Sequence, residues 1–126
     1  MTWTPADWQG WPLPPGLIEA VRERMSTISI PVYSASRSFL RNINRLEVRQ
    51  ITDAQVHLLV VTAWRFRRQM GSLAPPERIA KESQAWLTAR QEEAAVRARA
   101  ALEDRQARRV EKRRRAAGMQ AGQRLI

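Results

Sequence analysis

A long stretch without helix breakers places the strongest constraint on how this chain can fold. After Pro76, no proline or glycine occurs until Gly118. The stretch is rich in alanine, glutamate, glutamine and arginine, which all have high helix propensity. Pro76 suits a first helical turn, and Gly118 is placed as a C-terminal stop. As one helix, residues 76–117 would span about 60 Å at 1.5 Å per residue. A domain of this size cannot cover such a helix along its whole length.

Apolar residues divide this predicted helix into two parts. In the front part, four side chains fall within an arc of about 100° at 100° per residue: Ile79, Trp86, Leu87 and Ala94. After Arg97, only Leu102 and Val110 are large and apolar. We therefore expect the front part to dock on a core and the back part to project into solvent as a basic arm.

Three shorter segments before this helix also have helical signals. Residues 16–26 and 36–50 are amphipathic, and either Ser34 or Ser36 can cap the second segment. The third segment begins with a capping box, Thr52 with Gln55, and runs to about Met70 before Gly71. It is apolar on nearly all sides, which predicts that it forms the centre of the core.

The predicted fold class is all-α, a small domain of three to four helices with a long basic C-terminal helix projecting from it. The domain covers residues 17–95. A leader rich in tryptophan and proline, residues 1–16, precedes it, and a basic helical arm with a frayed tail, residues 96–126, follows. Residues 27–33 alternate polar and apolar side chains, but Pro31 would remove a hydrogen-bond donor from a strand, so an extended linker is favoured.

The order of elements from Thr27 to Met70 also resembles the ribbon-helix-helix class of DNA-binding proteins. The resemblance consists of a short alternating segment, a helix, a capped turn and a second helix. It implies that Ile28, Ile30 and Val32 face the core, that Thr27 and Ser29 face the major groove, and that two chains pair through their strands. The chain departs from the class at Pro31 and in the long gap between Val32 and Phe39.

Arginine dominates the charge of the chain. The net charge is +10, and all 22 basic residues except Lys81 and Lys112 are arginine. Arginine makes bidentate contacts with phosphate. A GC-rich genome also raises arginine content, and the sequence leaves both explanations open. The candidate nucleic-acid-binding residues are Arg37, Arg41, Arg45 and Arg49 in one stripe, Arg65 and Arg68 near the end of the third helix, and Arg108, Arg109, Arg113, Arg114 and Arg115 in the arm.

The three leader tryptophans, Trp3, Trp8 and Trp11, have two interpretations. They can fold back to cover the core of their own domain. Alternatively, they can form a short motif whose side chains fill pockets on a partner protein. The second interpretation favours an adaptor or a small component of a larger assembly.

Signs of catalysis are scarce in this sequence. His57 is the only histidine and lies in the most apolar helix, four residues after Asp53. There is no cysteine, no phosphate-binding glycine loop and no metal-ligand spacing. We expect no enzymatic activity, no catalytic residues, no metal and no cofactor. The longest apolar stretch, residues 56–64, is too short to cross a membrane, and no signal peptide is evident. The expected location is the cytoplasm.

Two functional hypotheses follow from these features. The first is a non-enzymatic, regulatory protein that binds DNA or RNA through arginine-rich helical surfaces. The alternative is a protein–protein interaction or assembly factor that docks through the tryptophan-rich leader and the long helix. The arginine excess favours the first hypothesis, and the leader tryptophans favour the second. The oligomeric state is left open.

Overall fold

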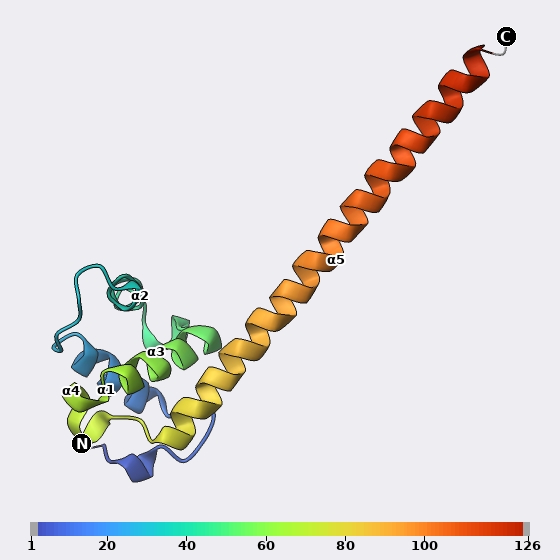
Figure 1. The fold of residues 1–126 in the computed structure, drawn as a ribbon. Helices are drawn as coiled ribbons and strands as arrows, with labels where there is room; N and C mark the ends of the chain where they lie inside the picture. Colours follow the sequence, from blue (N-terminus) through green and yellow to red (C-terminus); the bar gives the residue numbers. More distant parts are fainter. Residues whose placement is uncertain (1–2, 125–126) are drawn as a thin grey trace. The chain divides into compact units, whose positions relative to one another are not determined.

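The structure, a computed structural model, describes residues 3–124 and the side chains of residues 3–119. Within that range, all regular structure is helical and no strand occurs, which confirms the predicted all-α fold class. Figure 1 shows the α-helices α1 (Pro15–Met25), α2 (Ala35–Ile43), α3 (Asp53–Arg65), α4 (Arg67–Met70) and α5 (Glu77–Arg124), and the chain also has 3-10 turns η1 (Pro5–Asp7), η2 (Val48–Gln50) and η3 (Gly71–Leu73).

The chain divides into two compact units, one up to Thr88 and one from Ala89 onward. The first unit contains the leader, α1–α4 and the start of α5. The second consists of the rest of α5. The structure thus assigns the leader to the same unit as the helices that follow it.

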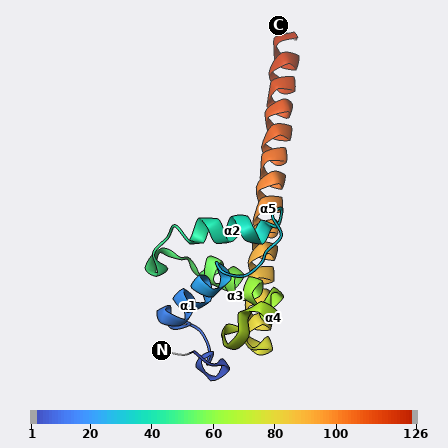
Figure 2. The same ribbon diagram turned by 90° about the vertical axis from the view of Figure 1, so that its left-hand side faces the viewer.

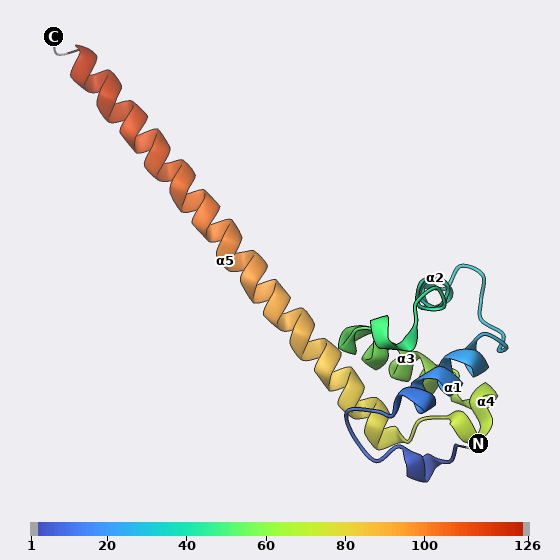
Figure 3. The same cartoon turned by 180° about the vertical axis from the view of Figure 1, so that it is seen from behind.

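The core of the first unit lies between α1 and α3. α1 contributes Leu17, Val21 and Met25, all at most 1% exposed. α3 contributes the most buried residues of any helix in this unit, as predicted: Val56, His57, Leu59, Val60, Thr62 and Ala63. α2 packs across one side of these helices and buries Leu40 and Ile43 (Figure 2). The connection between α4 and α5, which includes η3, contacts α1 (Figure 3).

The leader forms part of this core. Trp8 is only 2% exposed, and the partly buried Trp3 and Trp11 pack against the same cluster. A reciprocal capping box between Thr4 and Asp7 holds η1, with the Thr4 amide 2.7 Å from an Asp7 carboxylate oxygen. Trp8 therefore covers the core of its own domain. A docking role for the leader on a partner protein stays a prediction.

The second helix is shorter than predicted. α2 ends at Ile43, whereas the amphipathic pattern suggested that the helix would continue to residue 50. A turn follows, and then η2, which is capped by Glu47 and Gln50. The four-residue spacing of the arginines therefore does not describe one continuous helix face.

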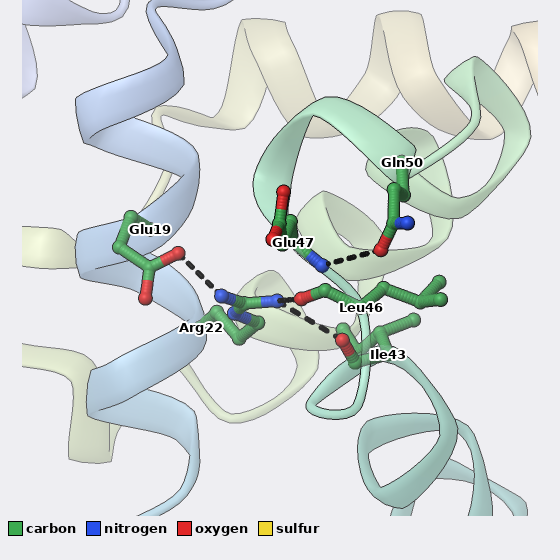
Figure 4. Close-up of polar contacts among 6 residues, drawn as sticks. All are labelled: Glu19, Arg22, Ile43, Leu46, Glu47 and Gln50. Carbon is green, nitrogen blue, oxygen red and sulfur yellow. Dashed lines mark hydrogen bonds and ion pairs between the residues drawn. The ribbon is translucent and has the colours of Figure 1, made fainter.

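Arg22 on α1 contacts the end of α2 and the turn that follows it. Its guanidinium donates to the backbone carbonyl of Ile43 at 3.0 Å and to that of Leu46, and it pairs with Glu19 (Figure 4). The carbonyls in the last turn of a helix have no partner within the helix. Arg22 supplies a charged donor to the Ile43 carbonyl at the end of α2 and to the Leu46 carbonyl in the turn that follows. The side chain of Arg22 is only 11% exposed.

The third helix also ends earlier than predicted. Thr52 and Gln55 form the expected capping box, but α3 stops at Arg65. Phe66 leaves the helical conformation with φ −102° and ψ 25°, and the short α4 follows. Gly71 then has φ +61°, a left-handed conformation that favours glycine, so the predicted stop at this residue is confirmed.

Two expectations for the long helix are wrong. The helix does not stop at Gly118, because α5 is continuous to Arg124. Gly118 is not among the residues with positive φ, so it does not adopt the usual C-terminal capping conformation. In addition, Ala94 is exposed, although the other predicted docking residues are buried (Ile79) or partly buried (Trp86 and Leu87), and Ala80 and Ser83 are buried beside them. The last two residues of the predicted frayed tail lie outside the described range.

The resemblance to the ribbon-helix-helix class does not hold in the structure. The segment 27–33 forms turns and irregular backbone, and Val32, expected in the core, is 68% exposed. Gln69 holds the segment in place: its side-chain amide accepts from the amide of Ser29 at 2.9 Å and donates to the carbonyl of Ser29 at 3.0 Å. The preferred interpretation of this segment as a linker is confirmed.

We predict that Arg22→Met destabilises the first unit by about 2–4 kcal/mol, because hydrogen bonds from a charged donor each contribute about 1.5–3 kcal/mol. Methionine keeps an apolar stem but leaves the two carbonyls without this donor. Arg24→Met is the matched control, because Arg24 also donates to a backbone carbonyl, that of Gln69, but at an exposed site. Urea unfolding measures both free energies. Equal losses for the two variants would contradict the role assigned to Arg22.

Candidate functional site

The described side chains of the second unit are exposed along their whole length, from Ala89 to Met119. Two ion pairs with i,i+4 spacing form here, Arg108 with Asp104 at 3.1 Å and Arg115 with Glu111 at 3.2 Å. Because both observed pairs are well exposed, they leave the guanidinium groups accessible and contribute little to stability.

The charges of this segment are segregated around the helix. At 100° per residue, seven of the nine basic residues between positions 97 and 115 fall within an arc of about 160°. We call this the basic face: Arg97, Arg105, Arg108, Arg109, Lys112, Arg113 and Arg115. The three acidic residues of the segment lie outside the arc, as do Arg99 and Arg114. The basic face therefore presents one sign of charge over about 27 Å of helix.

A second group of arginines borders an open cavity in the first unit. Arg37 and Arg41 are exposed on α2 and line a cavity of about 510 Å³ together with Ser26, Ser29 and Asn44. No acidic side chain lines this cavity. Neither guanidinium group forms an ion pair or hydrogen bond with another described residue. The site thus offers two guanidinium groups beside hydroxyl and amide groups, which is the chemistry of phosphate recognition.

The other two arginines of the predicted stripe lie beyond α2. Arg45 is exposed in the turn after α2, and Arg49 is exposed in η2, where it pairs with Glu47 at 2.6 Å. Of the four arginines in the predicted stripe, only Arg37 and Arg41 line the cavity of about 510 Å³.

The arginines at the end of α3 have structural contacts. Arg65 donates to the hydroxyl of Ser36 at 3.3 Å, which joins the end of α3 to the start of α2. Arg67 lies over the ring of Trp64 at 4.2 Å, a cation–π contact. Arg65, Arg67 and Arg68 line a smaller cavity of about 320 Å³. Arg65 and Arg68 are the two predicted residues of this group. Arg68 is exposed, and its side chain makes no hydrogen bond or cation–π contact within the described range.

Another cavity of the first unit has an aromatic wall. His57 stacks on Trp86 with ring centroids 4.3 Å apart and contacts Trp11 at 4.0 Å. Its Nδ1 lies 3.1 Å from the hydroxyl of Ser83, which is fully buried. The cavity measures about 550 Å³ and is lined by these three rings with Pro12, Leu13, Ile18, Val56, Asp53 and Glu82.

The position of His57 sets its protonation state. The side chain is 6% exposed, and burial lowers its pKa below the ordinary value of 6.5, although the negative charge of Asp53 opposes this shift. The neutral form of the imidazole is therefore the dominant one at neutral pH. A neutral ring can stack between Trp11 and Trp86 without adding positive charge to the cavity.

Sequence reasoning found His57 and its proximity to Asp53 but missed the cavity around them. Trp86 and Ser83 were recognisable only as residues of the long helix, and Trp11 only as a leader tryptophan. Trp11, His57 and Trp86 come from the leader, α3 and α5 respectively. Because these segments are far apart in the sequence, no local motif indicated the cavity. Among the described residues, no group of three or more histidine or acidic side chains could hold a metal ion.

Comparisons with known proteins add no assignment to this geometry. No protein-family model, curated protein or solved structure matches the chain. Within the described range, no helix has the length and apolar character needed to cross a membrane.

We predict that stability declines as the pH falls below about 6.5, because unfolding then lets His57 take up a proton that the folded state resists. The loss continues down to the lowered pKa of the folded state and is absent above the ordinary value. Unfolding free energies measured from pH 7.5 to pH 5.5 should show a smaller slope for His57→Gln. An unchanged slope would contradict the neutral state assigned to His57.

Proposed function

We propose that the protein is a non-enzymatic nucleic-acid-binding protein that uses arginine-rich helical surfaces. The basic face of α5 is the observation that carries this proposal. Its side chains are exposed, and the three acidic residues of the same segment lie outside its arc, with Asp104 and Glu111 pairing at its edge with Arg108 and Arg115. A helix with this arrangement can contact several phosphates of one strand or groove, while its acidic side remains turned away from the polyanion.

The physical basis of such binding is the release of counterions. Each phosphate that a basic side chain neutralises releases condensed cations, so affinity falls with salt by about 0.9 log units per log unit of salt on duplex DNA. Most residues of the basic face are arginine, which suits phosphate as well as guanine. Gln106 is the only amide side chain between residues 97 and 115. We therefore expect binding by α5 to depend little on base sequence.

The cavity beside Arg37 and Arg41 supports a contribution from the first unit. Both guanidinium groups are exposed and are not engaged by acids of the described chain. The neighbouring Ser26, Ser29 and Asn44 add neutral donors and acceptors. A phosphate with its sugar or base has matching groups, so any preference for DNA over RNA, or for particular bases, is expected to come from this unit.

The test uses two double variants of equal charge. Arg105→Gln/Arg109→Gln removes two unpaired residues of the basic face, and Arg99→Gln/Arg114→Gln removes two arginines outside it. We expect the first variant to reduce the salt slope of binding to duplex DNA by about two units, and the second to change it much less. Fluorescence anisotropy at several salt concentrations, with structured RNA as a parallel probe, gives the slopes.

Two results would contradict this proposal, and a third measurement separates charge from bidentate contacts. If the intact protein binds neither nucleic acid at micromolar concentration in about 0.1 M salt, where the Debye length is about 10 Å, nucleic-acid binding is rejected and the assembly hypothesis replaces it. If both double variants lose the same slope, the net charge acts and the basic face does not. If lysine replacements at 105 and 109 restore the slope, charge is sufficient; failure to restore it indicates bidentate arginine contacts.

The contribution of the first unit has a separate test. Arg37→Gln/Arg41→Gln should weaken binding by about tenfold and reduce the salt slope by one to two units, as expected for about two lost phosphate contacts. Arg67→Gln/Arg49→Gln, which removes the same charge from this unit at arginines with intramolecular partners, is the control. Equal affinity for the Arg37/Arg41 variant and the unaltered protein would exclude this cavity from the interface. Circular dichroism verifies that each variant remains folded.

A further inference from the structure

The cavity around His57 is opposite in charge to the rest of the protein. Its lining includes two carboxylates, Asp53 and Glu82, and no lysine or arginine, although the chain carries a net charge of +10. A site of this kind repels the phosphates that the basic surfaces attract. The cavity therefore has a ligand chemistry different from that of the proposed nucleic-acid interface.

The wall of the cavity is held rigid by contacts across the fold. His57 packs between Trp11 and Trp86, and Ser83 fixes the orientation of its ring through Nδ1. Trp11 and Trp86 are only partly buried, so their ring systems also reach the cavity surface. Because the stack joins the leader, α3 and α5, the aromatic surface is preformed and loses little conformational entropy when a ligand binds.

The remaining lining favours a ligand with an apolar body. Pro12, Leu13, Ile18 and Val56 provide aliphatic surface below the aromatic rings. The volume of about 550 Å³ lies within the range of about 300–1,000 Å³ that is usual for small-molecule sites. A simple inorganic cation would leave this apolar surface exposed to water, whereas an alkyl or aryl group would cover it.

The two carboxylates supply the polar end of the site. Asp53 is exposed at the start of α3 and makes no ion pair within the part of the chain that is described. Glu82 pairs with Arg78 at 3.3 Å, but both side chains are largely exposed, at 44% and 59%, so the pair is weak and replaceable. Neutral His57 adds no repulsion toward a positive charge. Aromatic faces attract cations as well.

We propose that this cavity binds an amphipathic organic cation, an amine or guanidine carried on an apolar body. The apolar body covers the aromatic and aliphatic lining, and the cationic group lies between Asp53 and Glu82. Arg78 is the competing cation of the protein itself, which a ligand displaces from Glu82.

The test uses the full chain and three probes of nearly the same shape: 2-phenylethylamine, 2-phenylethanol and phenylacetate. Isothermal titration calorimetry gives the affinities, and tryptophan fluorescence reports on Trp11 and Trp86. We expect the amine to bind at least tenfold more tightly than the alcohol, and phenylacetate not to bind. Equal affinity for amine and alcohol would overturn the proposal, because binding would then depend on the apolar surface alone.

Carboxylate variants locate the cation. Asp53→Asn and Glu82→Gln should each weaken binding of the amine about fivefold or more and leave binding of the alcohol unchanged. Glu77→Gln is the matched control, because it removes an exposed acid of α5 that does not line the cavity. If the two cavity variants bind the amine as well as Glu77→Gln does, the site is wrong. Thermal unfolding shows whether a loss reflects the ligand or the fold, and the two variants from different helices provide independent evidence.

Discussion

One partly buried guanidinium group joins two helices of the first unit. Arg22 on α1 donates to two carbonyls at the end of α2 and pairs with Glu19 on its own helix. This contact joins the end of α2 and the turn before η2 to α1. The cavity bordered by Arg37 and Arg41 lies between α1, the linker and α2. Its shape therefore follows from the same contact, which keeps α1 and α2 at a defined spacing.

The parts of the fold that could be predicted are those with local causes. Thr52 with Gln55, Gly71 and the apolar pattern of α3 act within a few residues of the boundary they determine, and the structure confirms them. The end of α2 could not be predicted, because the partner of its last carbonyls is an arginine 21 residues earlier in the chain. Gly118 failed as a stop for a related reason: glycine permits a left-handed cap but does not impose one, and the surrounding residues favour helix.

The candidate sites show the same division. The arginine content of α5 is a property of composition, so its charge was evident at once, and only the regular geometry of the helix was needed to separate the basic face from the acidic side. The His57 cavity depends on residues 11, 57 and 86, which no periodic pattern connects. Trp8 is a residue whose role the sequence alone left open between two interpretations. A tryptophan in a proline-rich leader is compatible with both a core residue and a linear motif, and the packing shows that Trp8 is buried.

The stacking of Trp11, His57 and Trp86 also has a consequence for biosynthesis. A ribosome produces the leader first, whereas the last ring of the stack is added 75 residues after the first. Until the start of α5 has left the exit tunnel, Trp8 and Trp11 lack the surface that covers them in the folded unit. A nascent chain thus exposes these aromatic side chains until residue 86 has been synthesised and released. Such segments are the ones that chaperones recognise, so the production of this protein is expected to be more sensitive to chaperone supply than its small size suggests.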